Sequence, residues 1–327
     1  MRGRIVKSLS GFYYVVPEES GTTVRHSAAQ EWYQCRAKGV FRALKVHPLV
    51  GDEVEFDITD PLSDPREGNV TAVLPRRNEL VRPTVANVDQ ALLLFAVTHP
   101  APSYNMLDRF LISMDLCGLP AILCFNKTDL ATEEEIKELR SIYEQCGCGV
   151  LFCSALESRD GQSEQLSELY SLLRGKTTVI TGPSGAGKST LINSLCPEAD
   201  METGALSEKI ARGKNTTRHV ELLEASAIPE KETPDAEGHR RTFVVDTPGF
   251  TSLDLLAVRD VKAEDLKLYY SEFETLSSSC RFHGCNHRKE PDCAVRNAAE
   301  SGSISRIRYQ NYCEIYDDLK MRRPVYR

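Results

Sequence analysis

A glycine-rich stretch in the middle of the chain has the residue types and the spacing that bind a nucleoside triphosphate. Residues 182–189 fit the pattern G-x-x-x-x-G-K-S. In this pattern backbone N–H groups surround phosphate oxygens, the lysine contacts the β- and γ-phosphates, and the hydroxyl binds Mg²⁺. The β-branched run 177–181 and the apolar positions of 191–195 predict a strand before the loop and a helix after it. The residues predicted to hold the phosphates are Gly182, Pro183, Ser184, Gly185, Ala186, Gly187, Lys188, Ser189 and Thr190.

A second motif, upstream of the first, indicates guanine as the base. Four residues directly after the apolar run 120–125 match N-K-x-D, namely Asn126, Lys127, Thr128 and Asp129. The Asp129 carboxylate can accept both the N1–H and the exocyclic N–H₂ of guanine, a donor pair that adenine lacks. Ser154 and Ala155 follow the next apolar run and match an S-A pair whose backbone contacts guanine O6. The competing interpretation is a polar helix cap after a strand.

A polar, glycine-bearing loop at 213–218 is the expected place for a threonine that completes the Mg²⁺ shell. Thr217 is the first choice because Arg218 and a strand-like run follow it directly. Thr216 is the alternative.

The strand-like run 242–246 leads into 246–249, which match D-x-x-G. Asp246 is expected to hold Mg²⁺ through water, and the Gly249 N–H to contact the γ-phosphate. The predicted magnesium site comprises Ser189, Thr217 and Asp246. The predicted catalytic residues are Lys188, Thr217 and Gly249, with Asn215 as a further candidate discussed below.

Four possible metal ligands lie within fourteen residues near the C-terminal end. The spacing is Cys280-x4-Cys285-x-His287-x5-Cys293, among polar and glycine residues. Three thiolates and an imidazole are the ligands of a structural, tetrahedral Zn²⁺ site. The alternatives are buried free thiols, or His283 as the fourth ligand in place of His287.

The composition is that of a soluble globular protein of two or three domains. The chain has 327 residues, 41% of them apolar and 27% charged. The first residues are polar, and no apolar run reaches the roughly 20 residues that a membrane span requires, so no signal peptide and no membrane contact are expected. Eleven scattered cysteines favour a reducing cytoplasm over a disulfide framework.

The net charge of −7 would by itself argue against a nucleic-acid partner, but the acidic excess is local. It lies in residues 78–257, whereas 1–77 and 258–327 are each close to neutral. Either end can therefore still present a basic face to RNA.

Residues 1–77 predict a small β-barrel domain. Short alternating runs are separated by turn residues such as Ser10-Gly11 and Gly51-Asp52. An oligonucleotide-binding (OB) barrel is the leading candidate, and an SH3-like barrel is the alternative. Five aromatic residues could stack on bases or fill the core: Phe12, Tyr13, Tyr14, Trp32 and Tyr33. Residues 75–78 have the look of a linker.

Residues 78–257 alternate apolar strands with helical segments, which predicts a mostly parallel sheet covered on both faces. In a Ras-like GTPase the phosphate loop and D-x-x-G precede N-K-x-D and S-A. Here N-K-x-D and S-A come first, so the expected fold is a circularly permuted Ras-like P-loop GTPase. The D-x-x-G region then leads directly into 258–327, predicted to be a zinc-binding helical domain.

Residues 294–320 are expected to be helical. Four basic residues of this stretch could face RNA or simply face solvent: Arg296, Arg306, Arg308 and Lys320.

The N-terminal barrel, the permuted GTPase motifs and the C-terminal cysteine–histidine spacing together resemble the RsgA family of ribosome-associated GTPases. The resemblance extends over essentially the whole chain, with GPSGAGKST, NKTD and DTPGF as its most specific parts. It implies a monomeric cytoplasmic factor that binds GTP or GDP, contacts 16S rRNA and acts on the small (30S) ribosomal subunit late in its maturation. It also implies weak GTP hydrolysis that the subunit stimulates, followed by release.

Two positions depart from the expected catalytic pattern. Phe250 stands where Ras-like enzymes carry a glutamine that orients water, a feature that the family shares. Asn215 stands where family members commonly carry a histidine, and an amide can hydrogen-bond water but cannot take its proton at neutral pH. We expect Asn215, Thr217 or the partner to orient the water. The alternative function is an RNA-binding checkpoint on another ribosomal particle, in which the nucleotide only gates affinity. Asp129 disfavours an ATPase or a small-molecule kinase.

Overall fold

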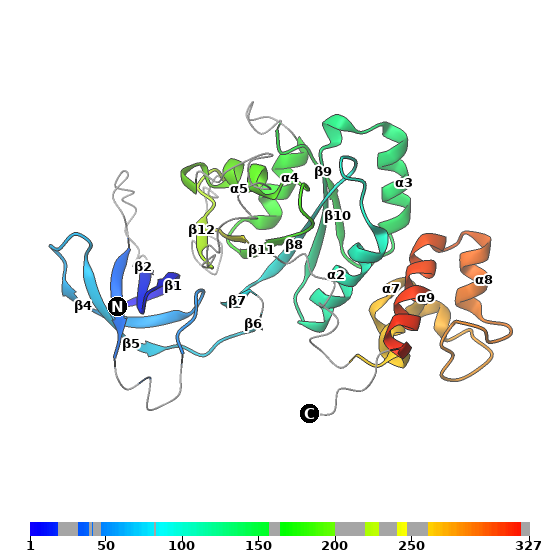
Figure 1. Ribbon diagram of the computed structural model, residues 1–327, viewed down its shortest axis with the longest axis horizontal. Helices are drawn as coiled ribbons and strands as arrows, with labels where there is room; N and C mark the ends of the chain where they lie inside the picture. Colours follow the sequence, from blue (N-terminus) through cyan, green and yellow to red (C-terminus); the bar gives the residue numbers. More distant parts are fainter. Residues whose placement is uncertain are drawn as a thin grey trace. The chain divides into compact units, whose positions relative to one another are not determined.

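The computed structural model divides the chain into two compact units. The first comprises 1–90, 170–181 and 189–250, and the second comprises 91–169, 182–188 and 251–327. The structure describes residues 1–18, 32–38, 41, 47–81, 83–156, 164–199, 220–228, 241–246 and 261–321. Figure 1 traces the elements along the chain. No helix within these ranges has the length and apolar character needed to cross a bilayer.

The first strands close into the small barrel predicted for the N-terminal region (Figure 1). Its strands are β1 (Arg2–Leu9), β2 (Phe12–Pro17), β3 (Tyr33–Ala37), β4 (Glu53–Asp60) and β5 (Glu67–Val73). They are ordered β1-β2-β3-β5-β4, with β3 and β5 parallel and the other neighbouring pairs antiparallel. A closed five-stranded barrel agrees with the OB-like prediction. Tyr33 faces the core, so it is not available to stack on a base.

The stretch after the barrel, whose composition suggested a linker, is held in place by side-chain contacts. Arg76 pairs with Asp52, whose side chain is fully buried, at N–O distances of 2.7 and 2.9 Å. A short hairpin of β6 (Glu79–Val81) and β7 (Thr84–Ala86) follows. The buried carboxylate needs a cationic partner, and this requirement holds the segment against the barrel.

The central sheet has six strands in the order β10-β9-β8-β11-β13-β12. Their bounds are β8 (Gln90–Ala96), β9 (Ala121–Asn126), β10 (Gly149–Phe152), β11 (Thr177–Thr181), β12 (Leu222–Glu224) and β13 (Phe243–Asp246). The pairs β8–β9, β9–β10 and β11–β13 are parallel, and β12 runs antiparallel to β13. Every residue of β8 is buried, as expected for a strand covered on both faces.

Two helices of this region begin at side-chain caps. Ser103 caps α2 (Tyr104–Leu116) by accepting a bond from Met106 N. Thr132 and Glu135 form a capping box at the start of α3 (Glu133–Tyr143). The other helical elements are η1 (Thr128–Leu130), α4 (Glu164–Leu173), α5 (Lys188–Leu195) and η3 (Pro197–Ala199).

The C-terminal residues form a helical cluster beside α2 (Figure 1). Its elements are η5 (Ala263–Tyr269), α7 (Ser271–Ser277), α8 (Ala294–Ser301) and α9 (Arg306–Met321). Residues 294–320, which were expected to be helical, form the two helices α8 and α9. Gly302 ends α8 in the left-handed conformation with φ of 79°, which glycine adopts without a Cβ clash. The apolar core here joins Ile112 of α2 to Leu266, Phe273 and Tyr312.

Arg308 was expected to offer charge to RNA or solvent, and the structure shows that this is wrong. It lies in α9, and only 3% of its side chain is exposed. Its guanidinium donates to Asp108 of α2 at 2.7 Å, and to Glu272 of α7 at 2.5 and 3.0 Å. We call Asp108, Glu272 and Arg308 the buried triad.

Candidate nucleotide and metal sites

The phosphate loop joins β11 to α5, as the sequence predicted. Gly182 has φ of 152°, and a Cβ built there would lie 1.9 Å from Leu94 O of β8. Gly187 has φ of 95°, and its Cβ would lie 2.2 Å from Asn126 Nδ2. Side chains are excluded at both positions by what packs against the backbone, which explains the two outer glycines of the motif.

Asn126, the first residue of N-K-x-D, connects three loops. Its Nδ2 donates to Ala186 O of the phosphate loop at 2.9 Å. Its Oδ1 accepts from Ala155 N of the S-A pair, also at 2.9 Å. The side chain is buried, with 2% exposed. A role for Asn126 in joining these loops was not apparent from the sequence, because both contacts join residues far apart in the chain.

Asp129 lies in η1, with an exposed carboxylate that is fixed on one side. Ser154 Oγ donates to Asp129 Oδ1 at 2.6 Å, and Ser154 itself is completely buried. Lys127 has the left-handed φ of 67°, and its ammonium donates to His99 O at 2.5 Å. The arrangement restrains the carboxylate that was predicted to read guanine.

The amine of Lys188 lies inside the phosphate loop. It donates to Gly182 O at 2.9 Å and to Pro183 O at 2.8 Å. Ser189 and Thr190 follow as the next residues of α5, and both are half-buried. A cation held within a loop of backbone N–H groups, at a helix N-terminus, suits an oligophosphate.

The structure describes little of the predicted magnesium and hydrolysis residues. The backbone of Asp246 ends β13 and pairs in register with Ile180 of β11, as predicted for the end of a parallel strand. The remaining predicted residues lie outside the described ranges: Asn215, Thr216, Thr217, Gly249 and Phe250.

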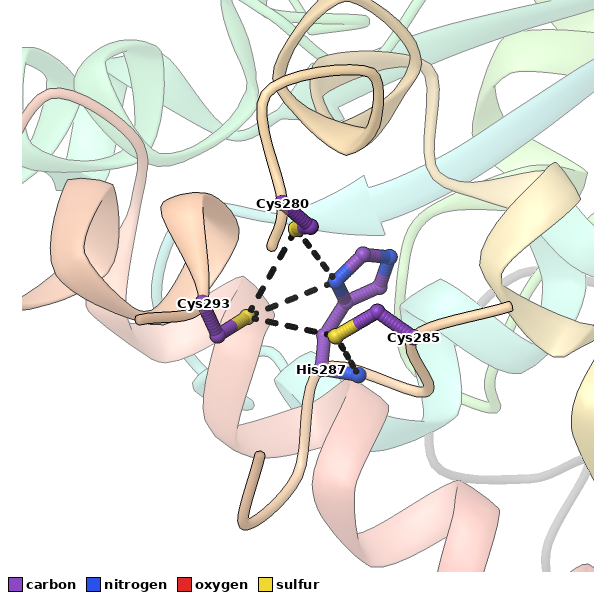
Figure 2. A group of neighbouring side chains, drawn as sticks. All are labelled: Cys280, Cys285, His287 and Cys293. Carbon is purple, nitrogen blue, oxygen red and sulfur yellow. Dashed lines mark hydrogen bonds between the residues drawn. The ribbon is translucent and has the colours of Figure 1, made fainter. Parts of the chain in front are cut away.

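The four predicted metal ligands converge (Figure 2). Cys293 Sγ lies 3.8 Å from Cys285 Sγ and 4.0 Å from Cys280 Sγ. His287 Nδ1 lies 3.6 Å from Cys280 Sγ and 3.5 Å from Cys293 Sγ. Tetrahedral Zn²⁺ with the usual bond lengths requires about 3.8 Å between sulfurs and about 3.6 Å between sulfur and nitrogen. The donor set therefore fits Zn²⁺. His283, the alternative ligand, is exposed and outside the cluster.

A hydrogen bond behind the imidazole orients His287. Ser277 Oγ lies 3.2 Å from His287 Nε2 and donates its own proton to Phe273 O at 2.7 Å. The hydroxyl oxygen is then free to accept from Nε2–H, which leaves Nδ1 unprotonated toward the sulfurs. Burial lowers the pKa of His287, which also favours the neutral imidazole that binds metals.

The surroundings of the cluster thiols favour binding of a cation. Burial raises the pKa of Cys285 to about 12 and also raises the pKa of Cys293. Backbone N–H groups point at two sulfurs, from His287 to Cys285 at 3.4 Å and from Arg296 to Cys293 at 3.5 Å. A divalent cation would stabilise all three thiolates at neutral pH.

Comparisons with known proteins extend over the whole chain. The model of the RsgA GTPase family matches residues 73–256, and that of the RsgA N-terminal domain matches residues 2–63. The small ribosomal subunit biogenesis GTPase RsgA of Agathobacter rectalis is 45% identical over 322 residues, covering 98% of this chain and 99% of that protein. Its counterpart in Alkaliphilus metalliredigens is 41% identical with the same coverage.

Two solved structures are similar in both fold and sequence. YloQ, described as a circularly permuted GTPase, superimposes with a TM-score of 0.71 at 34% identity and covers 99% of this chain and 96% of its own. YjeQ from Thermotoga maritima gives a TM-score of 0.71 at 32% identity and covers 98% and 99%. With its permuted motif order and full-length relatives, the chain belongs to the RsgA family of circularly permuted GTPases.

Proposed function

We propose that this GTPase is an assembly factor that binds the small ribosomal subunit late in its maturation and leaves after subunit-stimulated GTP hydrolysis. The curated relatives cited above carry the name small ribosomal subunit biogenesis GTPase. The structural observation that carries the proposal is the Asp129 carboxylate, which Ser154 Oγ holds on one side at 2.6 Å. This geometry supports a guanine nucleotide as the ligand that changes the state of the protein.

The proposed roles of the site residues follow their chemistry. Asp129 accepts the two guanine N–H donors, and Lys188 contacts the β- and γ-phosphates. Mg²⁺ is held by Ser189, Thr217 and Asp246, and the Gly249 N–H contacts the γ-phosphate. Asn215 or the ribosomal partner orients the attacking water, because Phe250 offers it no hydrogen bond.

The remaining assignments concern the metal and the domains. Zn²⁺ bound by Cys280, Cys285, His287 and Cys293 would cross-link the C-terminal helical cluster. The proposed domains are 1–77, 78–257 and 258–327, in a monomer that works in the cytoplasm.

The outward side of the barrel supports a contact with 16S rRNA. Phe12 and Arg36 are register partners on β2 and β3, with the guanidinium 5.0 Å from the ring centroid. Tyr14 and Trp32 lie edge to face with ring centroids 4.7 Å apart. Partly exposed aromatic rings beside an arginine are the groups on which single-stranded bases stack.

The function is tested by measuring GTP hydrolysis by the zinc-loaded full-length chain alone, with small subunits, and with large subunits. We expect a low rate alone and strong stimulation by small subunits only. Equal stimulation by both subunits, or none, contradicts the proposed partner.

A Lys188→Ala variant separates the proposed switch from an RNA-binding checkpoint. It loses nucleotide binding because the loop loses its cation. If the switch is correct, the variant binds small subunits much more weakly than the unaltered chain does in the presence of a non-hydrolysable GTP analogue. Undiminished binding favours the checkpoint.

Asp129→Asn tests the base assignment. The amide cannot accept both guanine donors, so affinity for GTP falls and affinity for xanthosine triphosphate rises. Unchanged GTP affinity contradicts the assignment.

A further inference from the structure

Two cysteines outside the metal cluster lie in contact in the loop between α3 and β10. Cys146 Sγ and Cys148 Sγ are 3.3 Å apart, and both side chains are partly exposed. Gly147 lies between them with φ of 82°. Residues two apart in sequence are at most about 7 Å apart at Cα, which is near the 4.4–6.8 Å range that a disulfide requires. A turn at a glycine therefore brings the two thiols within reach of a bond.

The two sulfurs are chemically unequal. The Cys148 thiol is hydrogen-bonded to the Cys146 sulfur, which lowers the pKa of Cys146 to about 7 and raises that of Cys148. The charge of Arg308 contributes to lowering the pKa of Cys146. A substantial fraction of Cys146 is then thiolate at neutral pH, and the thiolate is the nucleophile in disulfide exchange.

A second close thiol pair, Cys124 of β9 and Cys153 just after β10, provides a comparison. Cys124 Sγ and Cys153 Sγ are also 3.3 Å apart, but both residues are buried, and the hydrogen bond with Cys153 together with burial raises the pKa of Cys124 well above normal. Burial likewise raises the pKa of Cys35 and of Cys196 to about 12. Cys146 and Cys148 combine the three properties that disulfide exchange requires: their sulfurs are in contact, both side chains are partly exposed, and Cys146 is partly ionised at neutral pH.

Binding of a second metal ion explains the Cys146–Cys148 pair less well than a redox role does. Among the residues that the structure describes, the one group of three or more candidate ligands is the Cys280 cluster. Two sulfurs alone provide half of a tetrahedral shell.

We propose that Cys146 and Cys148 form a reversible redox dithiol whose oxidant is a low-molecular-weight disulfide of the glutathione class. Cys146 thiolate attacks one sulfur of the oxidant, which forms a mixed disulfide and releases one thiolate. Cys148 loses its proton and attacks the Cys146 sulfur, which closes the protein disulfide and releases the second thiolate. Two protein thiols are oxidised, one disulfide is reduced to two small thiols, and the two thiol protons end on those products.

The dithiol sits where this loop meets the C-terminal helical cluster. Ser271 Oγ at the start of α7 donates to Gln145 O at 3.0 Å, and Gln145 Nε2 donates to Ser303 O at 3.4 Å. A Cβ placed on Gly147 would lie 2.6 Å from Ser271 Oγ. Closing the ring changes the backbone next to these contacts, so the oxidised protein should exchange the amide hydrogens of 271–277 faster.

The test equilibrates the zinc-loaded full-length chain in glutathione buffers of graded reduced-to-oxidised ratio, alkylates the free thiols, and maps the tryptic peptides. Residues 141–159 form one peptide, which also contains Cys153. We expect a species with Cys153 alkylated and with Cys146 and Cys148 joined, lost again on reduction. Zinc content measured in parallel should not change.

The variants locate the bond. Cys146→Ser and Cys148→Ser each lose the closed species completely, and Cys148→Ser accumulates a glutathione adduct on Cys146. Cys153→Ser, which removes one member of the buried pair, keeps it. The proposal is overturned if no closed species forms in any buffer, if the bond includes Cys153, or if oxidation requires loss of zinc.

Discussion

Asn126 uses both ends of its side-chain amide to join segments that are distant in sequence. Its donor and its acceptor each make a bond of 2.9 Å in a buried setting. A buried polar group that loses its partner costs about 1–3 kcal/mol. The residue therefore fixes the shape of the site whatever base occupies it.

Replacing Asn126 with Ala should weaken GTP and xanthosine triphosphate binding alike, by about tenfold or more, since 1.4 kcal/mol corresponds to a factor of ten. Titration with fluorescent analogues of both nucleotides measures this. Asp129→Asn is the matched control, because it should alter the preference between the two bases. If Asn126→Ala lowers the affinity for GTP but not for xanthosine triphosphate, this amide takes part in recognising the base.

Ser277 holds His287 in the tautomer that presents Nδ1 to the cysteines. Ser277→Ala removes that support, and loss of such an outer hydrogen bond typically lowers metal affinity about 10- to 100-fold. Competition with a chromophoric chelator measures the zinc affinity.

The neighbouring exposed Ser278, whose hydroxyl bonds only locally to Thr275 O, supplies the control variant Ser278→Ala. Ser277→Thr should restore most of the affinity because the hydroxyl returns. Equal zinc affinities for the unaltered chain and the three variants would contradict an orienting role of Ser277.

At the level of elements, the buried triad joins three helices. Asp108 lies in α2, Glu272 in α7 and Arg308 in α9, and the Arg308 guanidinium also lies 4.8 Å from the Tyr270 ring centroid. Arg308→Met leaves two buried carboxylates without their cation, and breaking a buried pair costs about 3–5 kcal/mol. Urea unfolding measures the loss.

Arg306 supplies the matched control on the same helix. It is exposed, so Arg306→Met should change the free energy of unfolding by less than about 0.5 kcal/mol. Similar losses in the two variants would show that helix propensity, and not the triad, accounts for the effect.

The triad also makes stability depend on pH. Burial raises the pKa of Asp108 to about 6, although Arg308 opposes this shift. The unfolded carboxyl titrates near 3.9, so between about pH 4 and 6 the folded state binds more protons. The free energy of unfolding then falls as pH rises through this window, by up to about 3 kcal/mol from this group. Asp108→Asn removes this titrating carboxyl. The free energy of unfolding of the unaltered chain minus that of the variant should therefore fall between pH 4 and pH 6. A constant difference would contradict this.

The sequence predicts the elements of the sheet better than their long-range contacts. The apolar run of β8 and the motifs at the ends of β9 and β11 are local signals, and the structure places these strands close to the predicted ranges. Gly302 was missed as a helix end because the helical pattern continues on both sides of it. Arg308 was misjudged because its partners Asp108 and Glu272 are 200 and 36 residues away.

At the scale of the whole molecule, the phosphate-loop contacts given above are made by Leu94, by Asn126 and within the loop itself. The two metal-cluster cysteines Cys285 and Cys293 belong to the apolar core of the C-terminal helical cluster instead. Removing a structural metal removes folding free energy from the part that it cross-links.

Treatment with a strong chelator should therefore speed amide exchange in 261–321 while nucleotide affinity changes less than about threefold, far less than the effect of a lost buried bond. Exchange mass spectrometry and nucleotide titration on the same sample measure the two effects. Addition of Zn²⁺ should slow the amide exchange of residues 261–321 again. Loss of nucleotide binding in parallel with exchange would show that the two parts depend on each other.

The permuted order also has a consequence for how the protein is made. The N-K-x-D and S-A segments leave the ribosome first, and Asn126 precedes its acceptor Ala186 by 60 residues. At synthesis rates of about 5–20 residues per second, this interval lasts roughly 3–12 s. During that time the N-K-x-D and S-A segments exist without the phosphate loop. A nascent chain therefore gains the partner of Asn126 only when the phosphate loop is added, and the proposed magnesium and γ-phosphate residues Thr217, Asp246 and Gly249 follow later still.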